Sequence, residues 1–322
     1  MWKLSCVGVA CLASVSLAFT SSAQTYPDKP VRVIVPAPPG GALDIIARYV
    51  TQKLSEPFGA QFIVDNRGGA GGGIGADAAA RAAPDGYTLL LSSSSAVSVN
   101  PHFVPRAADP LQVFTPIVLV GWSPNVLVIH PSVPAKSVKE LIAVAKARPD
   151  ALAFGSNGAG SLSHLTGALF MQRAGIRMLH VPYKGAAPAV IDTMAGNVSV
   201  LFAAYASAST QARSAKLRAL AVTSAKRVEI APDLPTIAES ALPGFESTQW
   251  WGVYGPAGLQ GNVVTRLNAE LNRILHATET RKRFAIEGAE PAGGTPAELA
   301  AYHKADYEKW GKVIRSAGIK GE

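Results

Sequence analysis

The stretch VRVIVPAPPGGALDIIARYV, residues 31–50, governs the interpretation of the whole chain. Residues 31–35 form an apolar run typical of a buried strand, residues 36–41 a proline- and glycine-rich loop, and residues 42–44 open a helical pattern. Prolines keep the loop out of regular structure, and the first N–H groups of a helix are free to bind an anion. Every βα unit of a parallel sheet needs such a loop, so this stretch alone fits a ligand site and a plain connection equally well.

The first 23 residues are typical of an export signal. Lys3 precedes an apolar run over residues 4–19, and small residues favour cleavage after Ala23. Both cysteines, Cys6 and Cys11, lie inside this segment, so the exported chain has no thiol for disulfides, catalysis or metal binding. The apolar run is short for a membrane anchor, and the residues before Cys11 are a poor context for lipid attachment.

The chain is basic, with a formal net charge of +8 over 322 residues. Apart from residues 281–283, the basic residues are scattered, and no nucleic-acid recognition motif accompanies them. We therefore expect no nucleic-acid partner. The same charge favours small anionic ligands by long-range attraction.

Strand and helix patterns alternate along most of the chain, which predicts an α/β fold. The expected strands cover residues 31–35, 61–65, 87–91, 114–120, 125–129, 152–154, 178–183, 199–204, 217–223 and 249–256, and the remainder after 256 is expected to be helical. Two successive sets of strands indicate two domains, with strands near 117–130 and 249–256 crossing between them. We expect residues 24–122 and 250–322 to form one domain and residues 123–249 to form the other.

A second glycine-rich loop repeats the pattern of the first. Residues 155–165, GSNGAGSLSHL, follow a short strand and lead into a helix that runs to about Arg173. His164 is the one histidine placed near this helix start, although packing against its neighbours explains it equally well. The third strand ends in four serines, residues 92–95, and hydroxyls at the end of a parallel strand face the usual ligand crevice.

Several kinds of chemistry lack the residues they need. The six histidines show neither HxH nor HExxH spacing, which argues against a metal site, and no G-x-S-x-G elbow supports a serine hydrolase. Residues 71–76, GGGIGA, formally fit a dinucleotide fingerprint, but serines stand where the acidic residue should follow. We therefore expect no cofactor.

A set of motifs in order resembles the Bug (TctC) family. The motifs are YPDKPVR at 26–32, PPGG at 38–41 with Asp44, DNR at 65–67, PDGYTL at 84–89, SHL at 163–165, VPYKG at 181–185 and LRALAVT at 217–223. These are periplasmic solute-binding proteins of tripartite tricarboxylate transporters, and the resemblance extends from about Tyr26 to Ile319. It implies a two-domain periplasmic binding protein of the Venus-flytrap type, whose ligand, usually a carboxylate, is held by two loops that correspond to residues 39–44 and 155–164.

We combine this resemblance with the loop patterns to predict the ligand contacts. They are Pro39, Gly40, Gly41, Ala42, Leu43, Asp44, Ser92, Ser93, Ser156, Gly158, Ser161, Ser163, His164 and Ala203.

The chain departs from the family pattern at two places. Ala42 and Leu43 replace the hydroxyl residues common between the paired glycines and the aspartate, and Ala203 and Ala204 stand where many relatives carry an aspartate that faces an amino group. An amino-acid ligand is therefore disfavoured, and we expect a carboxylate with an apolar or aromatic body. Tyr205, Trp122 and Trp250 are candidates for the pocket walls, with core packing as the alternative role for each.

The expected function is capture of a small organic carboxylate in the periplasm by a monomeric protein and delivery to membrane transporter subunits. Presentation of the closed form to a signalling receptor is the alternative. An enzyme is disfavoured because no nucleophile and base can be paired.

Overall fold

The computed structural model describes residues 26–104 and 108–320, so the expected export signal at residues 1–23 lies outside the described residues. Strands of the described chain follow the order β2-β1-β3-β9-β4-β7-β5-β6, and β8 and β10 both pair with β4. The strands are β1 (Val31–Val35), β2 (Phe62–Asn66), β3 (Thr88–Ser93), β4 (Phe114–Ile129), β5 (Ala153–Ser156), β6 (Leu179–Pro182), β7 (Val200–Ala204), β8 (Arg218–Val222), β9 (Thr248–Pro256) and β10 (Glu290–Gly293).

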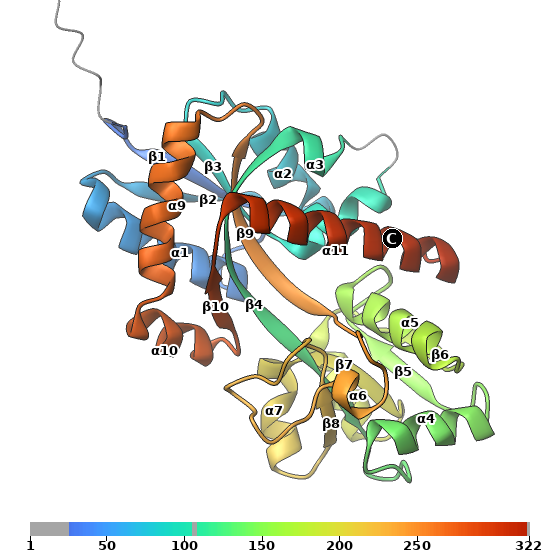
Figure 1. Ribbon diagram of the computed structural model, residues 1–322. Helices are drawn as coiled ribbons and strands as arrows, with labels where there is room; N and C mark the ends of the chain where they lie inside the picture. The colour runs from blue at the N-terminus through green and yellow to red at the C-terminus, as the bar shows by residue number, and fades with distance from the viewer. Residues whose placement is uncertain (1–25, 105–107, 321–322) are drawn as a thin grey trace, which may run out of the picture.

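Helices cover both faces of this sheet (Figure 1). They are α1 (Ala42–Phe58), α2 (Gly73–Ala80), α3 (Pro110–Val113), α4 (Val138–Ala147), α5 (Leu162–Ala174), α6 (Ala186–Met194), α7 (Tyr205–Arg213), α8 (Ile237–Ser240), α9 (Gly261–Leu275), α10 (Thr278–Ile286) and α11 (Pro296–Ala317). Three short helical turns, η1 (Ala70–Gly72), η2 (Ser95–Val99) and η3 (Asn100–His102), follow β2 and β3.

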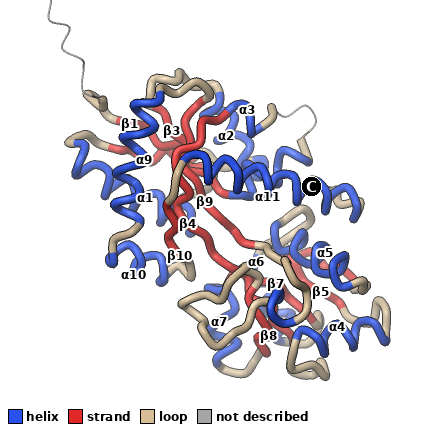
Figure 2. The backbone as a smooth tube through the Cα atoms, viewed as in Figure 1, coloured by secondary structure: helices blue, strands red, loops and turns tan. Residues whose placement is uncertain are grey.

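The long strand β4 joins two parts of the molecule (Figure 2). Its first part pairs antiparallel with β9 as far as Pro124, opposite Thr248, and from Asn125 onward it pairs with β7. We call the part built on β1, β2, β3, β9 and β10 the first domain and the part built on β5, β6, β7 and β8 the second domain. Only β4 and β9 cross between them as strands of the described chain, so they form the hinge region.

The first domain is packed on both faces of its sheet. Val31, Val33 and Val35 of β1 face α1 and α9, whereas Ile34 packs with α2 and Leu299 of α11 on the other face. Successive side chains of a strand point to opposite faces, so a strand covered on both sides needs apolar residues at successive positions. Val33, Ile34 and Val35 supply them, whereas Arg32 is exposed.

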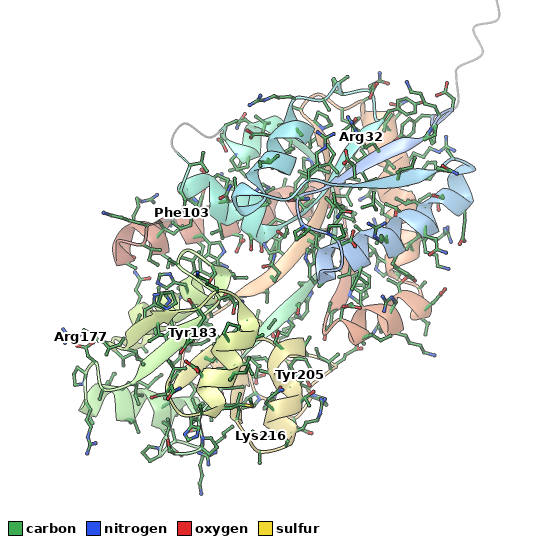
Figure 3. The ribbon with its side chains drawn as sticks, turned by 180° about the vertical axis from the view of Figure 1, so that it is seen from behind. Arg32, Phe103, Arg177, Tyr183, Tyr205 and Lys216 are labelled. Atoms are coloured by element: carbon green, nitrogen blue, oxygen red, sulfur yellow. The ribbon has the colours of Figure 1, made fainter. Side chains whose placement is uncertain are left out.

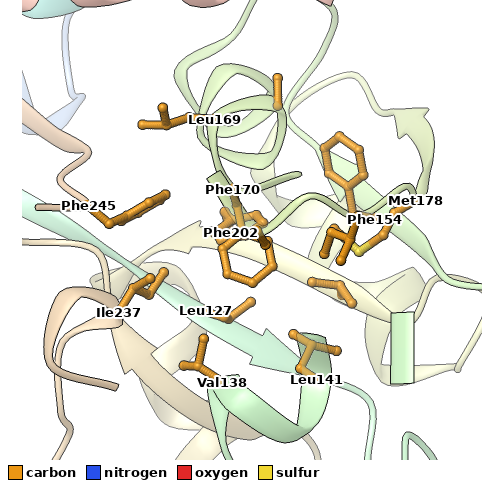
Figure 4. Close-up of a cluster of buried hydrophobic side chains, with 14 of the residues drawn as sticks. Leu127, Val138, Leu141, Phe154, Leu169, Phe170, Met178, Phe202, Ile237 and Phe245 are labelled. Atoms are coloured by element: carbon orange, nitrogen blue, oxygen red, sulfur yellow. The ribbon is translucent and has the colours of Figure 1, made fainter. Parts of the chain in front are cut away.

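The second domain has its own core (Figure 4). Phe154 of β5, Phe202 of β7 and Leu127 of β4 pack against α4, α5 and α8 in a cluster that also contains Phe170. The opposite face of the same strands packs against α6 and α7.

Helix α11 contributes to both cores. Leu299 near its start belongs to a cluster of the first domain, and Trp310, Val313 and Ile314 near its end belong to the main core of the second domain. Figure 1 shows the helix running from the first domain to a position beside α5, which it contacts. Thr295 caps it in a capping box with Glu298, which fixes where it begins.

The structure differs from the sequence-based expectation at two places. Strands expected at 114–120 and 125–129 form one strand, because residues 121–124 pair with β9 and, at Gly121 and Trp122, also with β10. The region after residue 256 is not purely helical, since β10 adds a short strand there.

Candidate binding site between the domains

A cavity of about 380 Å³ lies between the two domains. The second domain contributes residues 157–162 of the β5–α5 loop, and the first domain contributes residues of η1, η2 and η3, including Ser95 and Asn100. No charged side chain is among the described residues that line it. An anion in this cavity therefore has to be bound by backbone N–H groups, hydroxyls and amides.

The β5–α5 loop is shaped by hydrogen bonds between its own serines. The Ser161 hydroxyl donates to the carbonyl of Gly158 (2.7 Å) and caps α5 by accepting from the amide of His164 (3.3 Å). The buried Ser163 hydroxyl accepts from the amide of Asn157 (2.9 Å), and Ser156 donates to Gly158 (3.1 Å). These serines hold the loop in place, and of the predicted contacts in this loop Gly158 and Ser161 line the cavity.

His164 lies on the first turn of α5 and stacks on His180 of β6. The two ring centroids are 3.7 Å apart and the ring planes differ by 9°. Burial, with a further contribution from His180, lowers the pKa of His164 to about 4, and burial also lowers the pKa of His180. Both rings are therefore neutral near pH 7.

The β1–α1 loop adjoins η1, but none of residues 36–44 is among the described residues that line the cavity. Its Pro36 carbonyl is 3.3 Å from the position a Cβ on Gly72 would take, and neighbouring Ala70 and Gly71 line the cavity. Pro39, Gly40, Gly41 and Ala42 are exposed, whereas Leu43 and Asp44 are buried.

Helix α1 begins at Gly41 without a side-chain cap, so its first N–H groups have no side-chain acceptor. Gly40 has a φ of +88°, a left-handed conformation that favours glycine.

Asp44 fixes this loop from within the first domain. Its carboxylate accepts from the Gly40 amide (2.9 Å), from Arg48 Nε (3.0 Å) and from Asn66 Nδ2 (2.9 Å). Burial acts to raise the pKa of Asp44, but these hydrogen bonds outweigh it and hold the pKa below its usual value. Asp44 is therefore an ionised positioning group for the loop.

The serines after β3 divide between the core and the cavity. Ser92 is fully buried, Ser93 is partly buried, and Ser95 lines the cavity while its hydroxyl donates to the side chain of Gln249 (3.1 Å). Asn100 and Asn157 also line the cavity; neither was named as a contact, although Asn157 lies in the predicted loop at 155–164. The Asn157 side-chain oxygen is buried and accepts no hydrogen bond from the described residues, and as an acceptor it cannot pair with a carboxylate oxygen.

The remaining predicted residues lie in or near the hinge. Ala203 is buried in β7 opposite Val126 of β4. Trp250 is fully buried and donates to Asp306 (2.8 Å), so core packing explains it, and the Tyr205 hydroxyl donates to the carbonyl of Ile230 (2.9 Å). Trp122 lines a separate cavity of about 210 Å³ together with Tyr302.

Phe103 bridges the two domains at the rim of the cavity. It follows η3 in the first domain, lines the cavity and packs against the core of the second domain. Figure 3 shows it where the two domains adjoin.

Over residues 26–104 and 108–320, no three His, Cys, Asp or Glu side chains are grouped so that they could hold a metal ion. Within the same residues, every helix is too short or too polar to cross a lipid bilayer.

Comparison with known proteins identifies relatives over nearly the whole chain. Protein BugT of Bordetella pertussis is 39% identical over 311 residues, which cover 96% of this chain and 95% of BugT. A solved structure of R. palustris Rpa4515 with adipate superposes with a TM-score of 0.75 at 35% identity and covers 92% of this chain and 99% of that one. MatC from Rhodopseudomonas palustris with bound malate has a TM-score of 0.71 at 29% identity and covers 90% of this chain and all of MatC.

These structures confirm the predicted two-domain periplasmic-binding-protein fold. The sequence model described as "Tripartite tricarboxylate transporter family receptor" matches residues 46–319. The chain therefore belongs to the tripartite tricarboxylate transporter family of receptors, the TctC or Bug family expected from its motifs.

Proposed function

We propose that this protein binds a small organic carboxylate between its two domains and delivers it to the membrane subunits of a tripartite tricarboxylate-type transporter. The observation that carries this proposal is the cavity shared by both domains, lined by the start of α5 and free of charged side chains among the described residues. Two relatives of similar fold hold adipate and malate, which are both carboxylates. The periplasm is the proposed location, with residues 1–23 as the export signal.

Backbone amides supply the charge recognition in this proposal. The starts of α1 and α5 each leave N–H groups without intrahelical acceptors, and these bear the positive end of the helix dipole. The basic net charge, +7 once Lys3 is removed with the export signal, raises the encounter rate with an anion without a cation in the site itself.

Domain closure completes the site. We place the domain boundaries between residues 122 and 123 and between residues 249 and 250. The first is close to the point where β4 stops pairing with β9, at Pro124, and begins to pair with β7, at Asn125. Bending there brings the β1–α1 loop toward the β5–α5 loop and excludes water from the ligand.

The preferred ligand has an apolar or aromatic body. Exposed Ala42 offers no hydroxyl at the start of α1, and Ala203 and Ala204 offer no carboxylate for an amino group. The protein is proposed to act as a monomer and to release its ligand chemically unchanged. The Ser156 hydroxyl lies 2.7 Å from His180 Nε2, but neither residue is among the described residues that line the cavity.

A thermal-shift and calorimetry panel tests this function. The mature protein from Gln24 onward is titrated with adipate, malate, benzoate and glutamate, and binding to the folded state raises the Tm by mass action. We expect the largest shift from adipate or benzoate. If only glutamate raised the Tm, the proposed preference for an apolar or aromatic body would be refuted. If no carboxylate raised the Tm, the proposed carboxylate-binding function would be refuted.

Replacing Gly41 by leucine localises the site. A Cβ at Gly41 would meet no heavy atom within 4 Å, so Gly41→Leu should leave the Tm unchanged and weaken binding at least about tenfold, or ~1.4 kcal/mol. Gly261→Leu is the matched control, because Gly261 also stands at a helix start in open space, on α9. Equal affinities of the two variants would place the site elsewhere.

A further inference from the structure

The stacked imidazoles stand directly behind the loop that lines the cavity. His180 is opposite Phe154 in the parallel pair of β6 and β5, and the two rings stack with centroids 4.9 Å apart. His164 stacks on His180 with ring centroids 3.7 Å apart, and its ring centroid is 6.2 Å from that of Phe154. The pair therefore ties the first turn of α5 to the two strands beneath it.

Hydrogen bonding fixes the protonation state of His164. The backbone amide of Gly160 donates to His164 Nδ1 at 3.1 Å. A backbone N–H can only donate, so Nδ1 must carry a lone pair and the proton must be on Nε2. Gly160 itself lines the cavity between the domains, so the imidazole holds a segment of the binding loop.

Protonation of Nδ1 would reverse this interaction. The acceptor would become a donor pointing at the Gly160 amide, and a positive charge would appear on the first turn of α5, where the helix dipole disfavours cations. The groups that face His164 are Phe154 of β5, His180 of β6, and Gly160 and Ser161 of the loop, while Ser156 of β5 hydrogen-bonds to His180 (2.7 Å). His180 is the titratable group among those that face His164, and no carboxylate among the described residues compensates a charge there.

We propose that neutral His164, braced by His180, is a positioning residue that sets the Gly158–Ser161 segment for ligand binding, and that acid weakens binding by protonating it. The inference rests on the proposed function, because it assigns this segment to the carboxylate site. In this proposal His164 accepts a hydrogen bond from the loop and does not bind the ligand as a cation.

Two substitutions distinguish the hydrogen-bond acceptor of His164 from the stacking of its ring. His164→Asn keeps an acceptor on a shorter side chain and removes the titration, whereas His164→Phe keeps the ring for stacking and removes the acceptor. At pH 7.5 we expect His164→Phe to bind adipate between about twofold and tenfold more weakly than the wild type, the range of one lost hydrogen bond, and His164→Asn to recover most of that loss. Equal affinity of His164→Phe and the wild type would overturn the positioning role.

The pH profile tests the acid effect. The ratio of wild-type to His164→Asn Kd cancels protonation of adipate itself, and we expect it to rise as the pH falls from 5 to 3.5, because the pKa of His164 is about 4. A constant ratio would overturn the protonation effect.

Two readouts do not depend on any ligand. Nitrogen NMR of the free protein at pH 7.5 should show His164 protonated on Nε2, and a proton on Nδ1 would overturn the assigned geometry. Hydrogen exchange of the Gly160 amide should be faster in His164→Phe than in the wild type and slow again in His164→Asn, and unchanged exchange would refute the positioning role. If no carboxylate bound the wild type, the proposed function would fail while these readouts would still decide the role of His164.

Discussion

At the scale of single residues, Asp44 shows how a buried carboxylate can organise a loop. It joins the Gly40 amide, Arg48 and Asn66, and only 3% of its side chain is exposed. We expect Asp44→Ala to destabilise the protein by about 1–3 kcal/mol, because buried donors lose their acceptor. Urea unfolding measures this loss, and Asp77→Ala, which removes an exposed carboxylate from α2, is the control. If Asp44→Ala lost less unfolding free energy than Asp77→Ala, other contacts would have to hold the loop.

At the scale of elements, the approach of α5 to β5 depends on one glycine. A Cβ on Gly167 would lie 2.3 Å from Cε2 of Phe154, whose ring is fully buried and stacks on His180. We expect Gly167→Ala to cost about 1–3 kcal/mol by overpacking, although alanine favours helix more than glycine does. The urea midpoint should fall relative to Gly261→Ala, where the new methyl group meets open space. A rise in the midpoint would mean that Phe154 moves without cost.

The same scale shows how far the sequence could predict the fold. Apolar runs predict β1, β3 and β7 to within two residues, because these strands are buried on both faces. Strand β10 could not be predicted, since Glu290-Pro291-Ala292-Gly293 has no apolar pattern and is extended only because β4 offers it an edge.

Part of the candidate site was also predictable from a local sequence pattern. Glycine-rich loops before helices mark where backbone amides gather, so residues 155–164 were identified, and Gly158 and Ser161 do line the cavity. Asn100 and His180 were missed because their roles depend on contacts between segments distant in the chain, and Asn157 lies in the identified loop without having been named as a contact. The other predicted ligand contacts stay predictions.

At the scale of the whole molecule, buried histidines should make the protein sensitive to acid. Burial lowers the pKa values of His102, His164, His180 and His303 in the folded state. The unfolded chain therefore binds more protons once the pH falls below about 6.5, and stability falls with it. Burial raises the pKa of Glu290, which acts in the opposite direction at a single site.

The urea midpoint should accordingly be constant between pH 8 and pH 7 and decline from about pH 6.5 toward pH 4.5. Asp44 does not contribute in this window, because its pKa lies below 3.8. A flat midpoint from pH 7.5 to pH 5 would show that the folded protein takes up protons as readily as the unfolded chain.

The placement of α11 in both cores has a consequence for biosynthesis. The first domain needs Leu267 and Leu271 of α9 to cover β1, and the second needs Trp310 of α11, so both are completed by segments from the end of the chain. A nascent chain still attached to the ribosome lacks these segments and leaves both cores open. The order of synthesis thus delays native packing until α11 has emerged, which is compatible with the proposed export to the periplasm.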